Sequence, residues 1–322
     1  MEENTEQRVD LTLFSEKIQE LKDRIASVIV GQEQTVDLIL TAILANGHVL
    51  IEGVPGVAKT LLARLTARLI DADFSRVQFT PDLMPSDVLG TTVFNMKTNG
   101  FDFHQGPIFA DIVLVDEINR APAKTQAALF EVMEERQISI DGTTHRMGDL
   151  YTILATQNPV EQEGTYKLPE AQLDRFLMKI TMDYPSLEEE VNILERHHTN
   201  AALVKLDDIT PAITKEELLS LRAFMNQVFV DRTLLQYIAL IVQQTRTSKA
   251  VYLGASPRAS VAMLQSSKAY ALLQGRDFVT PEDIKFVAPY VLQHRLILTA
   301  EAEMEGYSPV KVTQRLIDKV EV

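Results

Sequence analysis

Residues Gly53-Val54-Pro55-Gly56-Val57-Ala58-Lys59-Thr60 form the most informative stretch of this chain. They follow the apolar run His48–Glu52, which predicts a strand, and they open the helical pattern Thr60–Ile70. A glycine-containing loop in this setting directs successive backbone N–H groups and a helix N-terminus at an anion. The stretch therefore predicts a phosphate-binding loop, in which Lys59 neutralises β- and γ-phosphate charge and the Thr60 hydroxyl binds Mg²⁺.

One position of this loop departs from the usual pattern. Ala58 stands directly before the lysine, where such loops usually carry glycine. We expect Ala58 to enter the helix in a right-handed conformation, which does not strain alanine, and Gly56 to supply the unusual backbone angles. Taken alone, an imperfect match can also be a turn without a ligand. The residues of this region expected to bind nucleotide are Gly53, Val54, Pro55, Gly56, Val57, Ala58, Lys59, Thr60 and Leu61.

An acidic pair follows a second apolar strand, at Asp116-Glu117. Two carboxylates at the end of a buried strand are costly without a cation or another partner, and the simplest partner is Mg²⁺ held through water by Asp116. Glu117 would then activate the attacking water as general base, a role worth roughly 10²–10⁴ in rate. The alternative is an exposed strand end that is followed by a helix cap.

A third strand, Thr152–Thr156, leads into Gln157-Asn158-Pro159. If this strand flanks the first one, Asn158 would lie near the phosphates, where it would orient the water or contact the γ-phosphate. Without that neighbour, Asn-Pro is simply a turn.

The order of the predicted elements separates the chain into two parts. Strand patterns occur at His48–Glu52, Arg76–Phe79, Ile112–Val115, Thr152–Ala155 and Leu177–Ile180. Helical patterns in the same part occur at Glu16–Ala26, Gln34–Ala45, Thr60–Ile70 and Lys124–Glu135. Strands that alternate with helices predict an α/β fold whose mostly parallel sheet is covered on both faces.

After Tyr184-Pro185 the chain is expected to be helical. Ser186 and Glu189 form a capping-box pattern. Further helices are predicted at Leu187–His197, Lys215–Phe229, Asp231–Thr247, Pro257–Leu273 and Pro281–Gln293. We therefore place a domain boundary near Pro185, between a core of residues 1–185 and a helical domain of residues 186–322.

Two hairpins are predicted within the first part. Residues 93–103 carry Asn99-Gly100, and residues 138–147 carry Asp141-Gly142. These dipeptides favour two-residue turns because both turn positions need a positive φ. By themselves, the hairpins could be surface decoration.

Composition excludes several classes of protein. The formal charge of −14 disfavours general binding to nucleic acids or anionic membranes. The absence of cysteine excludes disulfides, zinc–thiolate sites and cysteine nucleophiles. The start Met1-Glu2-Glu3-Asn4 lacks the apolar core of a signal peptide, and the longest apolar runs are far shorter than the ~18 residues of a membrane span. We expect a cytoplasmic protein.

The order of loop, acidic strand and Asn-ended strand resembles an AAA+ ATPase. Three stretches are similar to those of the MoxR family in particular, and the resemblance covers about residues 29–298. They are Glu52-Gly53-Val54-Pro55-Gly56, Asp116-Glu117-Ile118-Asn119-Arg120-Ala121-Pro122-Ala123-Lys124-Thr125-Gln126 and Leu168-Pro169-Glu170-Ala171-Gln172-Leu173-Asp174-Arg175-Phe176.

The resemblance implies a five-stranded αβα core with a helical lid, a helix-2 insert at 93–103 and a presensor-1 hairpin at 138–147. It implies that Asn158 is sensor 1, that Arg175 is the arginine finger for a neighbouring subunit, and that Arg258 is sensor 2, acting in cis or in trans. It also implies that Val30-Gly31-Gln32 packs on adenine, so Gly31 and Gln32 join the expected nucleotide site. Arg175 beside Asp174 could instead be a surface ion pair, and Arg258 could likewise only decorate a helix N-terminus. A cation is electrostatically unfavourable at that position, however, which indicates an anion nearby.

The sequence thus predicts Mg²⁺-dependent ATP hydrolysis by a MoxR-type ring, with six subunits expected. The resemblance implies a chaperone-like role toward a client protein, with a partner that contains a von Willebrand factor A domain. Three alternatives stay open: a metal-chelatase-type motor subunit, a DNA-acting motor, and a nucleotide-gated scaffold without significant turnover.

Overall fold

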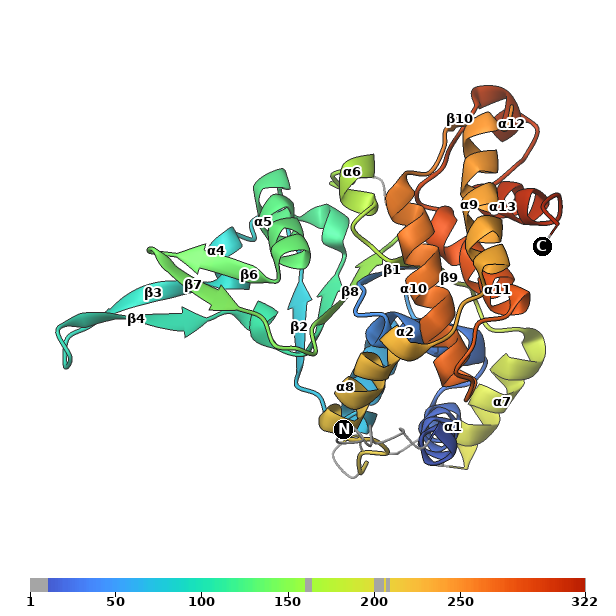
Figure 1. The fold of residues 1–322 in the computed structure, drawn as a ribbon. Helices are drawn as coiled ribbons and strands as arrows, with labels where there is room; N and C mark the ends of the chain where they lie inside the picture. Colours follow the sequence, from blue (N-terminus) through green and yellow to red (C-terminus); the bar gives the residue numbers. More distant parts are fainter. Residues whose placement is uncertain (1–10, 160–163, 200–205, 207–208, 322) are drawn as a thin grey trace, which may run out of the picture.

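The computed structural model describes residues 11–159, 164–199, 206 and 209–321, so the acidic start Met1-Glu2-Glu3-Asn4 lies outside the described residues. A five-stranded sheet in the order β2-β5-β8-β1-β9 forms the centre (Figure 1). Every neighbouring pair in it is parallel. The strands are β1 (Val49–Gly53), β2 (Phe74–Gln78), β5 (Ile112–Asp116), β8 (Thr152–Gln157) and β9 (Met178–Met182). Each overlaps its predicted range, and the predicted α/β fold is confirmed.

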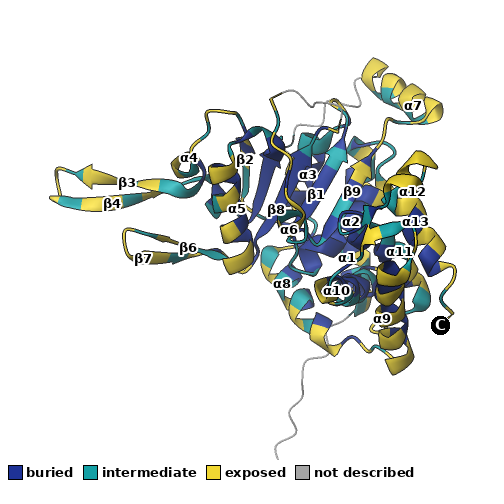
Figure 2. Cartoon of the chain, turned by 90° about the horizontal axis from the view of Figure 1, so that it is seen from above, coloured by how far each residue is buried: buried dark blue, intermediate teal, exposed yellow. Residues whose placement is uncertain are grey.

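Helices cover both faces of this sheet (Figure 2). One face packs against α2 (Glu33–Leu44) and α3 (Lys59–Leu69), with α1 (Leu11–Val28) packed on these two helices, and the other face packs against α5 (Ala123–Glu135). Side chains alternate along a strand. Leu114 of β5 therefore belongs to the hydrophobic cluster that includes α2 and α3, and Val115 belongs to the cluster that includes α5. Two short helices, α4 (Pro85–Leu89) and α6 (Glu170–Leu173), lie in the connections.

The region after Pro185 is mostly helical, as predicted. Its helices are α7 (Leu187–His198), α8 (Lys215–Phe224), α9 (Arg232–Thr247), α10 (Pro257–Leu273), α11 (Pro281–Leu292), α12 (Ala300–Met304) and α13 (Pro309–Ile317). The helix predicted to run to Phe229 ends at Phe224 and continues as the 3₁₀ turn Met225–Gln227. An unpredicted antiparallel pair joins β10 (Val251–Leu253) to β11 (Ile297–Leu298), strands too short for an alternating pattern to show.

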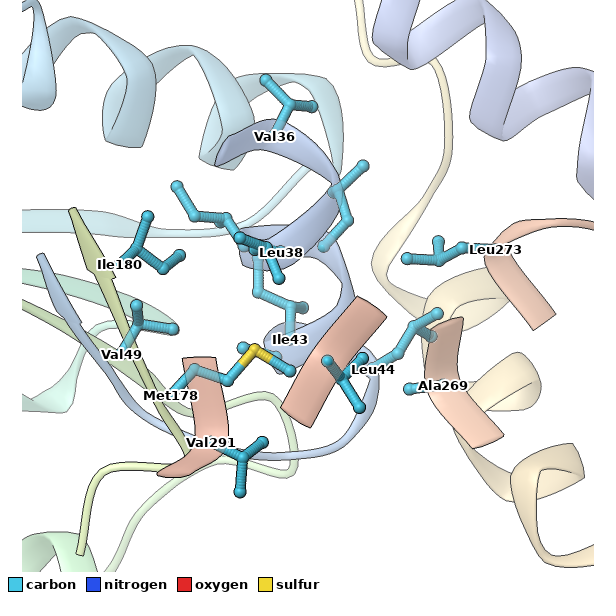
Figure 3. Close-up of a cluster of buried hydrophobic side chains, with 14 of the residues drawn as sticks. Val36, Leu38, Ile43, Leu44, Val49, Met178, Ile180, Ala269, Leu273 and Val291 are labelled. Carbon is cyan, nitrogen blue, oxygen red and sulfur yellow. The ribbon is translucent and has the colours of Figure 1, made fainter. Parts of the chain in front are cut away.

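The helical region and the sheet share one hydrophobic core. Figure 3 shows Ile43 and Leu44 of α2 and Met178 of β9 facing Leu273 of α10 and Val291 of α11. All five side chains are at most 3% exposed. Packing is therefore continuous across Pro185, where the architecture changes, and the two-domain division stays a prediction.

Both predicted hairpins are present and extend away from the sheet (Figure 1). In the pair β6 (Gln137–Ile140) and β7 (Thr143–Arg146), Asp141 and Gly142 have φ of 49° and 81°, as the predicted turn requires.

The turn predicted for the other hairpin is wrong. Its strands are β3 (Gly90–Asn95) and β4 (Gly100–Gln105), and Gly100 pairs with Asn95, so four residues form the loop. This register places Phe94 opposite Phe101, and their rings pack edge to face at 5.3 Å. The aromatic pair thus overrides the Asn-Gly signal.

Among the described residues, no helix combines the length and the apolar character needed to cross a membrane.

Candidate functional site

The predicted phosphate-binding loop connects β1 to α3 through two residues with left-handed backbone angles. Gly56 has a φ of 88°, and Ala58 has φ 60° and ψ 22°. The expected right-handed conformation of Ala58 is therefore wrong. The chain must turn from a strand into a helix within a few residues, and Gly56 alone does not complete that turn. Ala58 occupies the N-cap position of α3 and takes the angles that glycine usually supplies.

Lys59 lies on the first turn of α3 and folds back over the loop. Its Nζ donates to the Gly53 carbonyl at 2.6 Å. Burial lowers the pKa of Lys59, while the charges of Asp116 and Glu117 act in the opposite direction. The ammonium therefore feels both acidic side chains, and the loop and the acidic pair belong to one electrostatic site.

Asp116 ends β5 and has partners within the protein. One carboxylate oxygen accepts from Arg76 Nε at 2.6 Å, and the other accepts from the Thr156 hydroxyl at 3.1 Å. Arg76 on β2 is therefore a cationic partner of this carboxylate within the chain, and the binding of Mg²⁺ by Asp116 stays a prediction.

Glu117 follows with a strained backbone, at φ 56° and ψ 51°. Its N–H donates to Thr156 Oγ1 at 3.0 Å. Its Oε2 accepts from Gln78 Nε2 at 2.9 Å and lies 2.8 Å from Arg120 Nε. The left-handed turn directs this carboxylate away from the strand, where Gln78 and Arg120 hold it.

Asn158 joins the same edge of the sheet. β8 lies between β5 and β1, and Gln157 pairs with Glu52. Asn158 follows directly, is 8% exposed, and so lies beside the start of the loop. The condition set by the sequence, that this strand flanks the first, is met.

A cavity of about 270 Å³ lies against the loop. The segment Val28–Val30 and Gln32 line it together with Gly56, Val57, Ala58 and Leu61. The segment expected to pack on adenine and the phosphate loop therefore meet in one cavity. Gly31, at φ 75°, sits where a Cβ would collide with the Glu189 carboxylate.

Helix α7 supplies a wall of this cavity that sequence analysis missed. Ile193, Arg196 and His197 line it, and Arg196 donates to the carbonyls of Ala26 and Ser27 at 3.1 and 2.8 Å. Ser186 caps α7 as predicted, with its Oγ accepting from the Glu189 N–H. The cap pattern indicates where the helix begins, but it carries no information on where the helix packs.

Arg175 and Arg258 meet at the opposite edge of the sheet. Both contact Glu134 of α5: Arg175 Nε lies 3.0 Å from one carboxylate oxygen, and an Arg258 terminal nitrogen lies 2.7 Å from the other. Arg175 precedes β9, whereas the loop follows the far end of the parallel strand β1. A strand of this length spans about 15 Å, so neither guanidinium is placed at its own chain's loop.

The chain resembles known proteins over most of its length. Residues 48–178 match the profile of the ATPase family associated with various cellular activities (AAA), and residues 243–318 match that of the AAA lid domain. The uncharacterized protein YeaC of Bacillus subtilis is 47% identical over 93% of this chain and 93% of its own. Chaperone MoxR1 of Mycobacterium tuberculosis is 45% identical over 91% of this chain and 79% of its own, and protein MoxR of Methylorubrum extorquens is 30% identical over 91% of each. The crystal structure of an inferred ATPase from Cytophaga hutchinsonii, 41% identical, has a TM-score of 0.88 and covers 97% of this chain and 96% of its own.

Proposed function

The chain belongs to the MoxR family of AAA+ ATPases, and from this membership we propose that it binds and hydrolyses Mg²⁺-ATP. One observation carries the proposal: the phosphate loop, Asp116-Glu117 and Asn158 meet at one sheet edge. The cavity beside them joins that loop to the Val28–Val30 segment. The base would occupy the cavity, and the phosphates would extend along the N-terminus of α3 toward the acidic pair.

The residues at this edge suit Mg²⁺. Thr60 offers a hydroxyl on the first turn of α3, and Asp116 offers a carboxylate at the end of β5. Both are hard oxygen donors. Arg76 and Thr156 occupy part of the Asp116 carboxylate, but a carboxylate has about four acceptor positions, so Asp116 can also accept from a metal-bound water. When bound, the ion supplies positive charge to the phosphate oxygens.

We assign the proton transfer to Glu117. Gln78 and Arg120 hold one of its carboxylate oxygens, and Thr156 fixes its backbone. The carboxylate would accept a proton from the water that attacks the γ-phosphate. Asn158 would orient that water, and Lys59 would exchange the Gly53 carbonyl for phosphate oxygens.

Arg175 and Arg258 would serve the site of a neighbouring subunit. Their position at the amino edge of the sheet supports action in trans for both, and we propose this role for Arg258, which the sequence left open between cis and trans. Each would exchange Glu134 for phosphate oxygens when subunits assemble into a ring, for which we expect six subunits. Arginine suits this exchange because its planar fork binds carboxylate and phosphate in the same way.

Glu117→Gln tests the proposed base. The amide keeps the shape of the side chain but cannot take the proton, so phosphate release should fall by roughly 10²–10⁴ while ATP binding persists. Near-normal phosphate release from the pure variant would exclude Glu117 as the base. Loss of all turnover from the unmodified chain would instead favour a nucleotide-gated scaffold.

Mixing two variants tests the shared site. Arg175→Ala keeps its loop and base, and Glu117→Gln keeps its arginines, so each should be nearly inactive alone. In the mixture, some sites combine an intact loop from one chain with an intact finger from the other, and turnover should partly recover. Energy transfer between labelled chains would prove that subunits exchange. Co-assembly without recovery would contradict action in trans.

The work done with this ATP is proposed to be chaperone-like, in the cytoplasm, on a client protein and with a partner that contains a von Willebrand factor A domain. The name of the M. tuberculosis relative supports the first part of this proposal. The hairpin β3–β4 also supports it, because it exposes Phe94, Met96 and Phe101, with 48%, 88% and 74% of their surface accessible.

A further inference from the structure

Arg295 is a buried arginine whose partners gather around the segment that carries Arg175. It follows α11, and its side chain is only 4% exposed. Its Nε donates to a carboxylate oxygen of Asp174 at 2.7 Å. Its terminal nitrogens donate to the backbone carbonyls of Asp174, Phe176, Leu177 and Val291. These five hydrogen bonds match the five N–H donors of a guanidinium in number.

Asp174 extends this arrangement to Arg258. Its second carboxylate oxygen lies 3.4 Å from the hydroxyl of Ser256 and 4.0 Å from an Arg258 terminal nitrogen. Ser256 is the N-cap residue of α10, directly before the turn that carries Arg258. Asp174 therefore connects Arg295 to both segments that carry the arginines proposed to act in trans.

The backbone and the side chains of this region differ in how tightly they are held. Arg295 fixes carbonyl groups on both sides of Arg175 through a rigid planar fork. The Arg175 and Arg258 side chains, by contrast, are 32% and 61% exposed. Within the described part of the chain, both form ion pairs with Glu134, and Arg258 also lies 4.0 Å from an Asp174 oxygen. The two guanidiniums can thus change partner without moving the chain that carries them.

We propose that Arg295 is a positioning residue that holds Arg175 and Arg258 in register for the active site of the neighbouring subunit. The proposal rests on the shared-site function given above. Arg295 touches no substrate in it. It aligns the two arginines of one chain as a unit, so its loss should affect the neighbour's site and spare the chain's own loop.

The role of Arg295 is tested by placing the substitution on one side or the other of the shared site. Arg295→Gln is introduced either into the Glu117→Gln chain, which donates arginines, or into the Arg175→Ala chain, which offers only loop and base. Each double variant is mixed with the other single variant, which keeps Arg295, and phosphate release is measured. We expect at least a tenfold fall with the substitution in the donating chain and less than a twofold fall with it in the accepting chain.

Arg222→Gln is the matched control. Arg222 is a half-buried arginine that also donates to two backbone carbonyls, those of Asp149 and Ile43, away from Arg175. Its loss should reduce turnover equally in either placement, as any purely structural effect would. If Arg295→Gln does not fold, Arg295→Lys is used, since lysine keeps the charge and loses the fork.

The outcomes separate this proposal from the function on which it rests. Equal losses in the two placements, or none in the donating chain, overturn the role of Arg295 while the parent mixture remains active. An inactive parent mixture with proven subunit exchange overturns the shared site itself, and the role of Arg295 with it. Fluorescent-nucleotide binding by each variant confirms that its own loop is intact.

Discussion

Ala58 holds the phosphate loop in a conformation that alanine rarely adopts. A left-handed backbone costs an L-residue roughly 1–2 kcal/mol, because its Cβ approaches the following carbonyl oxygen. Glycine avoids this cost but loses about 0.5–1 kcal/mol through the entropy of the unfolded chain. The strain is the larger of the two terms at this position.

Ala58→Gly should therefore raise the free energy of unfolding, by up to about 1 kcal/mol. Urea unfolding of the ligand-free chain measures this. The control is Ala239→Gly at an exposed position within α9, where glycine should cost about 1 kcal/mol. Equal losses in the two variants would show that Ala58 is not strained.

His48 links stability to pH. Its Nδ1 accepts from the Ile153 N–H at 3.0 Å, and its Nε2 lies 3.2 Å from the Met133 carbonyl, so Nδ1 is unprotonated. Burial, helped by the charge of Arg136, lowers the pKa of His48 from 6.5 to about 3. The unfolded chain therefore binds a proton below pH 6.5 that the folded chain refuses until about pH 3, and stability falls as the pH drops through this window.

Between pH 7 and pH 5 this one group should remove about 2 kcal/mol of stability. His48→Asn keeps an acceptor near Nδ1 and has no such titration. Urea unfolding at both pH values should show a loss that is smaller by about 2 kcal/mol in the variant. The same loss in both chains would mean that His48 does not resist protonation.

The residue types at the site follow from the sequence, but their partners do not. Lys59, Asp116, Glu117 and Asn158 each end or open an element whose type the hydrophobic pattern predicts. Arg76 contacts Asp116 only because β2 lies beside β5, and strand order is a property of the whole sheet. Local spacing carries no signal for such contacts across strands.

At the scale of elements, the two hairpins show how far turn signals can be trusted. Asp141-Gly142 forms the turn that its dipeptide predicts, whereas Asn99-Gly100 yields to the packing of Phe94 on Phe101. The types of the main strands and helices were predictable because their apolar patterns extend over enough residues to be recognised. The position of α7 over the cavity was not, because α7 has no buried residue in the structure to mark an inward face.

Paired glycine substitutions test the two turns. Gly142 has a φ of 81°, so Gly142→Ala should cost its hairpin about 1–2 kcal/mol. Gly100 lies outside the left-handed region, and an added Cβ would meet its nearest atom, Thr98 Oγ1, at 3.7 Å, so Gly100→Ala should be nearly neutral. Hydrogen exchange of each hairpin's amides reports the local effect. A larger increase of exchange in β3–β4 of Gly100→Ala than in β6–β7 of Gly142→Ala would contradict the assignment of the left-handed glycine to the second hairpin.

At the scale of the whole molecule, the shared core predicts cooperative unfolding. Leu273 of α10 is 3% exposed and packs in the cluster that includes β1 and β9. Leu273→Ala should lower the free energy of unfolding by about 2–5 kcal/mol. It should also shift the transitions of sheet peptides and α10–α11 peptides together in denaturant-dependent hydrogen exchange. Helical peptides that open well before the sheet would show that the two parts are separate units.

Glu134 has a consequence for the chain before it assembles. Without Glu134, the neighbouring guanidiniums of Arg175 and Arg258 would form a small cationic patch that attracts RNA and free polyphosphates, even on a molecule of net charge −14. Glu134 neutralises this patch with a carboxylate of the same chain. In the proposed ring, assembly then replaces the Glu134 carboxylate by the phosphate of the neighbouring subunit's nucleotide. The unassembled subunit, in turn, presents no free cationic patch at these two arginines.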